Sequence, residues 1–80
     1  MSISLAYHHQ LNACGLVCPM PLLKTKLKLR ELNPSEVLFV RASDQGSWRD
    51  IPRFIEQSPY KLLLAQEVSN EYHFFIQKND

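Results

Sequence analysis

The chain has 80 residues, of which 45% are hydrophobic and 21% charged, a composition typical of one small folded domain. The formal net charge of +1 gives the protein no strong overall basic field, so we expect no direct contact with nucleic acid. No apolar run approaches the ~20 residues that cross a bilayer, and no secretory signal is visible. We therefore expect one cytoplasmic domain over residues 1–80, away from membranes, with residues 1–7 as a loose N-terminal extension or part of the first strand.

The first half of the chain predicts a strand and then a helix. Residues 8–13 indicate a short strand. The helix is expected to begin at Cys18, with Pro19 at the first helical position, where the missing N–H of proline costs nothing. It should end at Asn33, because the residue before a proline avoids the α region.

Two apolar stripes run along this predicted helix when residues are placed ~100° apart. The stripe expected to face the core consists of Leu22, Thr25, Leu29 and Leu32. The second consists of Met20, Leu23 and Leu27. A helix with two apolar stripes either lies beneath more protein or offers one stripe to a partner. We favour a partner for Met20 and Leu23 and leave Leu27 open, with Lys24 beside them to attract an acidic surface.

The second half predicts a strand, a helix and a hairpin. Residues 36–42 are rich in β-branched and aromatic side chains, as in a buried strand. Ser47 is expected to cap a helix from Trp48 to Gln57, because Ser-x-x-Asp has the form of a capping box. Residues 60–68 and 71–78 indicate a hairpin. The order β-α-β-α-β-β favours an α/β two-layer sandwich, with two helices on one face of a four-stranded mixed sheet.

The stretch "CGLVCPMP" at residues 14–21 carries the chemistry that the sequence suggests. A cysteine at a helix start lies near unpaired N–H groups and the positive end of the helix dipole, which lower the pKa of a thiol. A rigid, exposed Cys18 thiolate would suit acceptance of sulfur as a persulfide. Free cysteines are also commonly small buried hydrophobes, and the residues alone leave both interpretations open.

A family resemblance favours the first interpretation. "LNACGLVCPMPLLKTK" resembles the Leu-Asp-x-x-Gly-x-x-Cys-Pro-x-Pro signature of the TusA/SirA-like sulfur-carrier family, and "ASDQGSWRDIPRF" resembles its second signature. The resemblance implies the two-layer sandwich and a sulfurtransferase that carries sulfur as a persulfide on Cys18, without a metal or organic cofactor. It also implies that Pro19 and Pro21 shape the helix start and that Gly15 makes the preceding turn.

The same resemblance implies supporting roles and partners. Asp44 and Asp50 would act in helix capping and loop fixing rather than in chemistry. Asn12 stands where the family usually has Asp, which removes a charge near the thiol. The sulfur donor would be a cysteine desulfurase or another sulfurtransferase, and the acceptor a later protein in tRNA thiolation, molybdenum-cofactor metabolism or sulfur oxidation. We expect the chain to act as a monomer.

Cys14 lies outside the core signature. It could be a resolving thiol that attacks a Cys18 persulfide or sulfenic acid, although we favour an inert small residue at the end of the first strand. No metal site is expected, because the two cysteines supply only two ligands and His8, His9 and His73 have no recognisable spacing.

Two further residues and one other class of function complete these expectations. Trp48 and Arg49 are candidates for partner binding, since both types are enriched at binding hot spots, although a packed Trp and a solvated Arg are equally consistent with the pattern. The alternative function is a regulatory or redox-sensing interaction module that uses the same helix surface.

Overall fold

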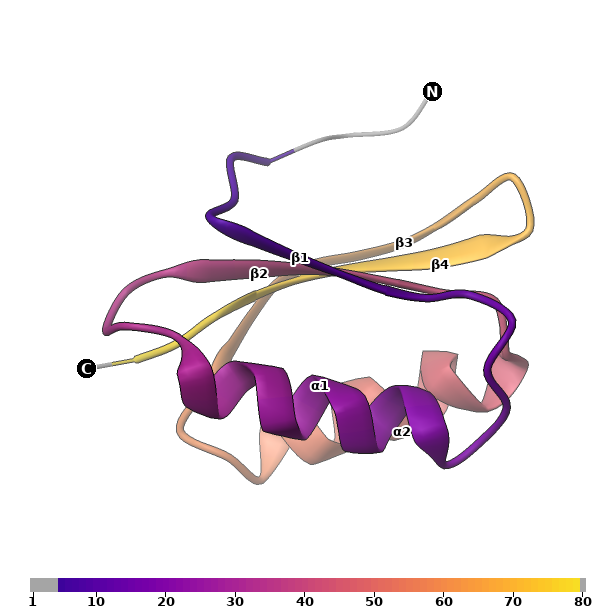
Figure 1. The fold of residues 1–80 in the computed structure, drawn as a ribbon, viewed down its shortest axis with the longest axis horizontal. Coiled ribbons are helices and arrows are strands. Elements are labelled where there is room, and N and C mark those ends of the chain that lie inside the picture. The colour runs from indigo at the N-terminus through magenta and orange to yellow at the C-terminus, as the bar shows by residue number, and fades with distance from the viewer. Residues whose placement is uncertain (1–4, 80) are drawn as a thin grey trace.

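The computed structural model describes residues 5–79, which form one four-stranded sheet with two helices beneath it (Figure 1). In chain order the elements are β1 (His9–Ala13), α1 (Met20–Glu31), β2 (Val37–Ala42), α2 (Gln45–Glu56), β3 (Lys61–Val68) and β4 (Glu71–Gln77). The strand order is β1-β2-β4-β3, with β1 parallel to β2 and the other pairs antiparallel. The predicted fold class is confirmed, and each strand lies within one residue of its expected bounds.

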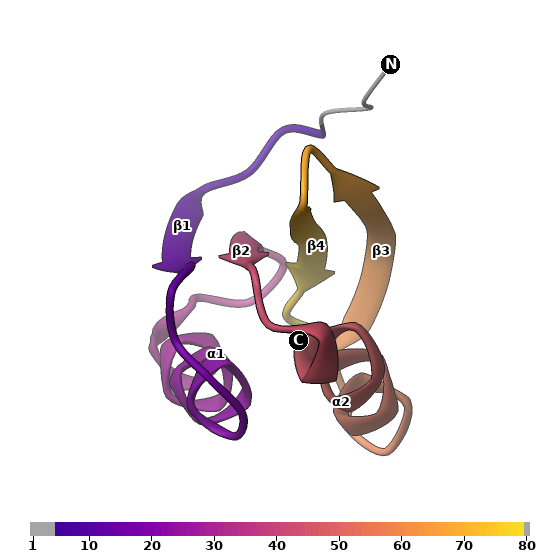
Figure 2. The same ribbon diagram turned by 90° about the vertical axis from the view of Figure 1, so that its right-hand side faces the viewer.

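The topology brings both helix starts to the same edge of the sheet. Because β1 and β2 are parallel, the connections that leave their carboxyl ends emerge together, and each leads into a helix. Figure 2 shows α1 beneath β1 and β2 and α2 beneath β3 and β4, side by side on one face. The two helix N-termini therefore lie close together, and the loop that contains Cys18 enters the first of them.

The core lies between the helices and the sheet. Its fully buried large side chains include Leu29 from α1, Ile51 from α2, and Leu38 and Phe74 from the central strands. The stripe predicted to face the core does so, except that Leu22 is only partly buried. Thr25 is also fully buried, and its hydroxyl donates a 2.7 Å hydrogen bond to the carbonyl of Pro21. This bond satisfies a polar group that would otherwise destabilise the core.

The start of each helix differs from its prediction. Pro19 is the N-cap of α1, one position before the helix, and Met20 is its first residue. In α2 the N-cap is Asp44, whose Oδ2 accepts a 3.0 Å hydrogen bond from the Gly46 N–H. The expectation that Ser47 caps this helix is wrong. Ser47 lies inside the first turn and is buried, because the competing Asp44 side chain satisfies the helix start three residues earlier.

The opposite face of the sheet carries its own aromatic cluster. Phe39 stacks on Phe75 with a ring separation of 4.6 Å, and Tyr7 packs over Phe39 at 5.1 Å. Tyr7, the last residue of the predicted N-terminal extension, therefore contacts the sheet. Residues 1–4 of the predicted N-terminal extension lie outside the described residues.

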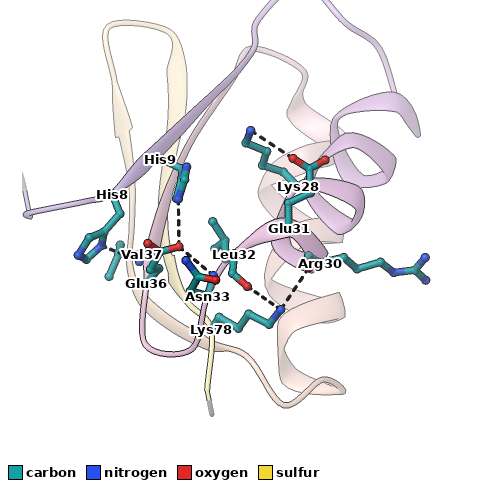
Figure 3. A network of polar contacts seen from close by, with 10 residues as sticks. All are labelled: His8, His9, Lys28, Arg30, Glu31, Leu32, Asn33, Glu36, Val37 and Lys78. Atoms are coloured by element: carbon teal, nitrogen blue, oxygen red, sulfur yellow. Dashed lines mark hydrogen bonds and ion pairs between the residues drawn. The ribbon is translucent and has the colours of Figure 1, made fainter.

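A polar network at the far end of α1 fixes the helix to the sheet (Figure 3). The Lys78 ammonium donates to the carbonyl of Leu32 at 2.9 Å, which satisfies the helix C-terminus. His9 Nε2 lies 3.0 Å from the Glu36 carboxylate, and His8 Nδ1 accepts from the Val37 N–H at 3.0 Å. Both histidines thus have structural partners at the end of α1 remote from Cys18.

Candidate functional site

The loop between β1 and α1 presents Cys18 as an exposed thiol. Gly15 adopts φ +85° in this loop, the left-handed conformation that glycine accepts most readily, so the predicted turn is present. The Gly15 N–H donates a 2.8 Å hydrogen bond to the Ser43 hydroxyl, which ties the loop to the segment after β2. Asn12 Oδ1 accepts a 3.0 Å hydrogen bond from the Cys14 N–H. Asn12 therefore supports the backbone of the turn, a role that needs an acceptor oxygen and not a charge.

The first turn of α2 lies directly against Cys18. A Cβ atom added at Gly46 would stand 3.3 Å from the Cys18 Cβ and 2.8 Å from the Asp44 carboxylate. No side chain fits at this position without displacing one of these groups. Sequence reasoning missed Gly46 as a site residue, although a glycine in a helical first turn, where it costs stability relative to alanine, was an available signal.

Asp50 contacts the thiol itself. The Cys18 Sγ–H donates to Asp50 Oδ2 at 3.2 Å, and Arg49 Nε donates to the other carboxylate oxygen at 3.4 Å. The expectation that Asp50 only caps a helix or fixes a loop is therefore incomplete. Its carboxylate, which a capping box would direct back toward Ser47, points to the cysteine of the preceding helix start.

These contacts reverse the expected direction of the thiol pKa. The hydrogen bond to Asp50 raises the pKa of Cys18, with smaller contributions from burial and from the negative charges of Asp50 and Asp44. The Arg49 charge acts the other way. The pKa of Asp50 is correspondingly lowered, chiefly by the hydrogen bond from Cys18. The helix dipoles offer only about half a charge, so a full negative charge within hydrogen-bond reach dominates. Cys18 is therefore an exposed thiol whose pKa lies above its ordinary value.

Cys14 has different surroundings. Ala13, the last residue of β1, is fully buried, whereas Cys14 follows it in the turn and is only partly buried. The pKa of Cys14 is raised, first by burial and then by the charge of Glu71. Glu71 holds Arg41 through two hydrogen bonds of 2.9 and 3.0 Å, and the Arg41 and His73 contacts lower the pKa of Glu71 to about 2. The structure thus places Cys18 beside Asp50, and Cys14 beside the Glu71 carboxylate that binds Arg41. Arg41 and Glu71 belong to the open face of the sheet, which is the face that the helices do not cover.

The second apolar stripe of α1 is exposed. The exposed fractions of Met20, Leu23 and Leu27 are 40%, 44% and 59%, so the stripe does not widen the core contact. Lys24 is exposed beside it, and Lys28 pairs loosely with Glu31 at 3.6 Å. We refer to Met20, Leu23 and Leu27 as the α1 stripe. It begins two residues after Cys18 and extends away from the thiol along the helix.

Trp48 is packed on one side and Arg49 is solvated, and partner binding by these two residues stays a prediction. Trp48 packs against Tyr72 and Phe74 with ring separations of 5.3 and 6.0 Å, yet it remains exposed on its other side. Arg49 is largely exposed, and its guanidinium reaches Asp50. Both residues therefore lie on α2, whereas the α1 stripe lies on the other helix.

A shallow groove of about 210 Å³ separates the two helices. Leu22 and Lys26 line it from α1, and Asp50, Arg53, Phe54 and Gln57 line it from α2. The Lys26 ammonium lies 5.0 Å from the centre of the Phe54 ring, within the range of a cation–π contact. Asp50 belongs both to the groove and to the Cys18 contact, although Cys18 itself does not line the groove.

Residues 5–79 contain neither a cluster of metal-binding side chains nor a membrane-spanning helix. No group of three or more His, Cys, Asp or Glu side chains in this range could hold a metal ion. Neither helix of the described chain has the length and apolar character needed to cross a membrane.

The sequence and the fold of this chain both match proteins of one known family. The family model for sulfurtransferase TusA matches residues 9–78. The sulfur carrier protein TusA of Allochromatium vinosum is 36% identical over 91% of this chain and 96% of its own length. A relative from Methanocaldococcus jannaschii is 38% identical over 86% of this chain and 92% of its own. The crystal structure of a SirA-like protein from Desulfitobacterium hafniense shares the fold, with a TM-score of 0.78 and 21% identity over 91% of this chain and all of that one. The chain belongs to the TusA sulfurtransferase family.

Proposed function

We propose that this protein is a sulfur carrier that accepts sulfane sulfur on Cys18 as a persulfide and passes it to an acceptor protein. The observation that carries the proposal is the exposed Cys18 thiol at the meeting point of two helix starts. The relatives support it, since the Allochromatium vinosum protein is named a sulfur carrier. Cys14, in its separate surroundings on the open face, takes no part in the relay.

The proposed relay is balanced in atoms and electrons. Cys18 sulfur attacks the outer sulfur of a persulfide on the donor, so that a new S–S bond forms as the donor S–S bond breaks. The proton of Cys18 passes to the departing donor thiolate. In the second step a thiolate of the acceptor attacks the outer sulfur on Cys18 and restores the Cys18 thiol. Both steps are thiol–disulfide exchange chemistry, and neither uses a metal or an organic cofactor.

The surface around Cys18 supports delivery to protein partners. The α1 stripe gives an apolar contact beside the sulfur, and α1 carries four basic side chains against one acidic side chain. A partner with an acidic rim around an apolar centre fits this surface, because complementary charge speeds and orients association. We propose a cysteine desulfurase or another sulfurtransferase as the donor.

Intact-protein mass spectrometry tests the proposal directly. The reduced chain is incubated with cysteine and a cysteine desulfurase, or with thiosulfate and a second sulfurtransferase. The expected product carries one added sulfur atom that a reductant removes, and a sample alkylated beforehand gains none. A folded chain with free thiols that gains no sulfur from either donor would contradict the carrier role and favour the redox-sensing interaction module.

A further inference from the structure

The contact between Cys18 and Asp50 acts differently on the free Cys18 thiol and on the Cys18 persulfide. We refer to these two states as the empty and the loaded Cys18. An ionised carboxylate only accepts hydrogen bonds, so Asp50 holds Cys18 through the thiol proton over 3.2 Å. The carboxylate is itself held in place, since it projects from α2 and receives Arg49 Nε at 3.4 Å. Its side chain is only 22% exposed, which limits screening by solvent. The empty Cys18 is therefore anchored against α2.

Loading removes the basis of this anchor. In a persulfide the inner sulfur has no proton, and the neighbouring sulfur makes the terminal S–H more acidic than an ordinary thiol. The loaded side chain thus exchanges a hydrogen-bond donor for an anion. A second negative charge within hydrogen-bond reach of a carboxylate is repelled. The charged groups that act at this position are Asp50 and Arg49 from α2 and Asp44 at its N-cap, while Arg53 acts on Asp50 itself.

Resting on the proposed function, we infer that Asp50 is an electrostatic latch, which holds the empty Cys18 thiol against α2 and expels the persulfide anion toward the α1 stripe. Gly46 leaves the space in which the empty thiol lies. The direction of release follows from the fold, because both carboxylates belong to α2 and its N-cap, whereas the α1 stripe belongs to the other helix and begins two residues after Cys18. The empty thiol is protected from unwanted oxidation, and the loaded sulfur faces the surface proposed for partners.

The Asp50→Asn variant separates charge from shape. It keeps an acceptor oxygen and the same size, but it removes the negative charge. Glu56→Gln is the matched control, because it makes the same change on the exposed last residue of α2. Both are made in a Cys14→Ser background, so that one thiol remains, and circular dichroism verifies the fold of each variant.

Two rates are expected to change in opposite directions. Alkylation of the empty Cys18 by iodoacetamide at pH 7 should rise roughly threefold to tenfold in Asp50→Asn, because more of the thiol is ionised without the adjacent charge. The pH profile of alkylation should move to lower pH. Hand-off of sulfur from the loaded chain to glutathione should slow by about threefold, because the charge of Asp50 no longer repels the persulfide. A merely structural role for Asp50 would not give this pair of opposite changes.

The outcomes distinguish the latch from the proposed function. Equal alkylation rates in Asp50→Asn and Glu56→Gln would overturn the latch, even if the wild-type chain still loads sulfur. Faster hand-off in Asp50→Asn would overturn the expulsion step. A wild-type chain that takes up no sulfur would overturn both the proposed function and the expulsion step. Alkylation of the empty thiol does not depend on loading, so it would still test separately whether Asp50 holds that thiol.

Discussion

Replacement of Cys18 by serine is expected to abolish sulfur uptake, whereas Cys14→Ser should leave it close to the wild-type amount. A serine hydroxyl forms no persulfide, but it keeps the size of the side chain and can still donate to Asp50 Oδ2, which the thiol contacts at 3.2 Å. The fold should therefore survive the change, and the loss should be chemical. Intact masses after incubation with the donor measure the added sulfur in each variant.

The serine variants also decide the role of Cys14. Cys14 lies beside the Glu71 carboxylate and is only partly exposed, whereas Cys18 is exposed, so a donor protein reaches Cys14 less readily. A disulfide between the two cysteines in the loaded wild-type chain, absent from Cys14→Ser, would revive the resolving-thiol interpretation. Added sulfur that persists in Cys18→Ser would place the carrier chemistry at Cys14 and contradict the proposed function.

The second large effect is expected from Leu23→Glu on the α1 stripe. Leu23 is 44% exposed, so a charge there should change the free energy of unfolding by only about 0.5 kcal/mol. In the docked complex the same charge would be buried without a partner. Loss of an interface hot spot costs about 2 kcal/mol or more, which corresponds to a fall in transfer of roughly thirtyfold. The measurement is the rate of sulfur uptake from a cysteine desulfurase at a donor concentration below saturation.

Leu63→Glu is the matched control for this variant. Leu63 is also an exposed leucine, 36% accessible, but it lies on β3 rather than on α1. Uptake by Leu63→Glu should stay near the wild-type rate. If both variants lose uptake equally while folded, the effect is one of general surface charge. If Leu23→Glu transfers sulfur normally, the docking surface does not include the α1 stripe.

The fold was predictable because its signals are local. Helix and strand periodicity depends on neighbouring residues, and the repeated apolar positions identified both the core stripe and the exposed α1 stripe. The start of α2 was mispredicted because Asp44 and Ser47 are both good N-cap residues only three positions apart. The sequence contains no direct measure of which one satisfies the first turn. In the folded chain the Gly46 N–H donates to Asp44 Oδ2, which makes Asp44 the N-cap.

The electrostatics of the site were not predictable, because they depend on residues that are far apart in the sequence. Asp50 follows Cys18 by 32 positions, and only the crossover that starts both helices at one edge of the sheet brings them together. A helix-start argument uses the local backbone and therefore expects a lowered thiol pKa. The folded chain adds a full negative charge from another helix, which reverses the direction. The requirement for glycine at position 46 was missed for the same reason, because it is Cys18 in the neighbouring loop that leaves little room for a side chain there.

The most direct test of the carrier role follows one labelled sulfur atom through the protein. The chain is loaded with isotopically heavy sulfur by a cysteine desulfurase, purified, and then mixed with excess glutathione, and peptides are analysed by mass spectrometry before and after mixing. We predict that the label is on the peptide containing Cys18 before mixing and on glutathione afterwards, with the Cys18 thiol restored. Label that never reaches Cys18, or that stays there after prolonged reaction, would contradict a protein that carries sulfur from one partner to the next.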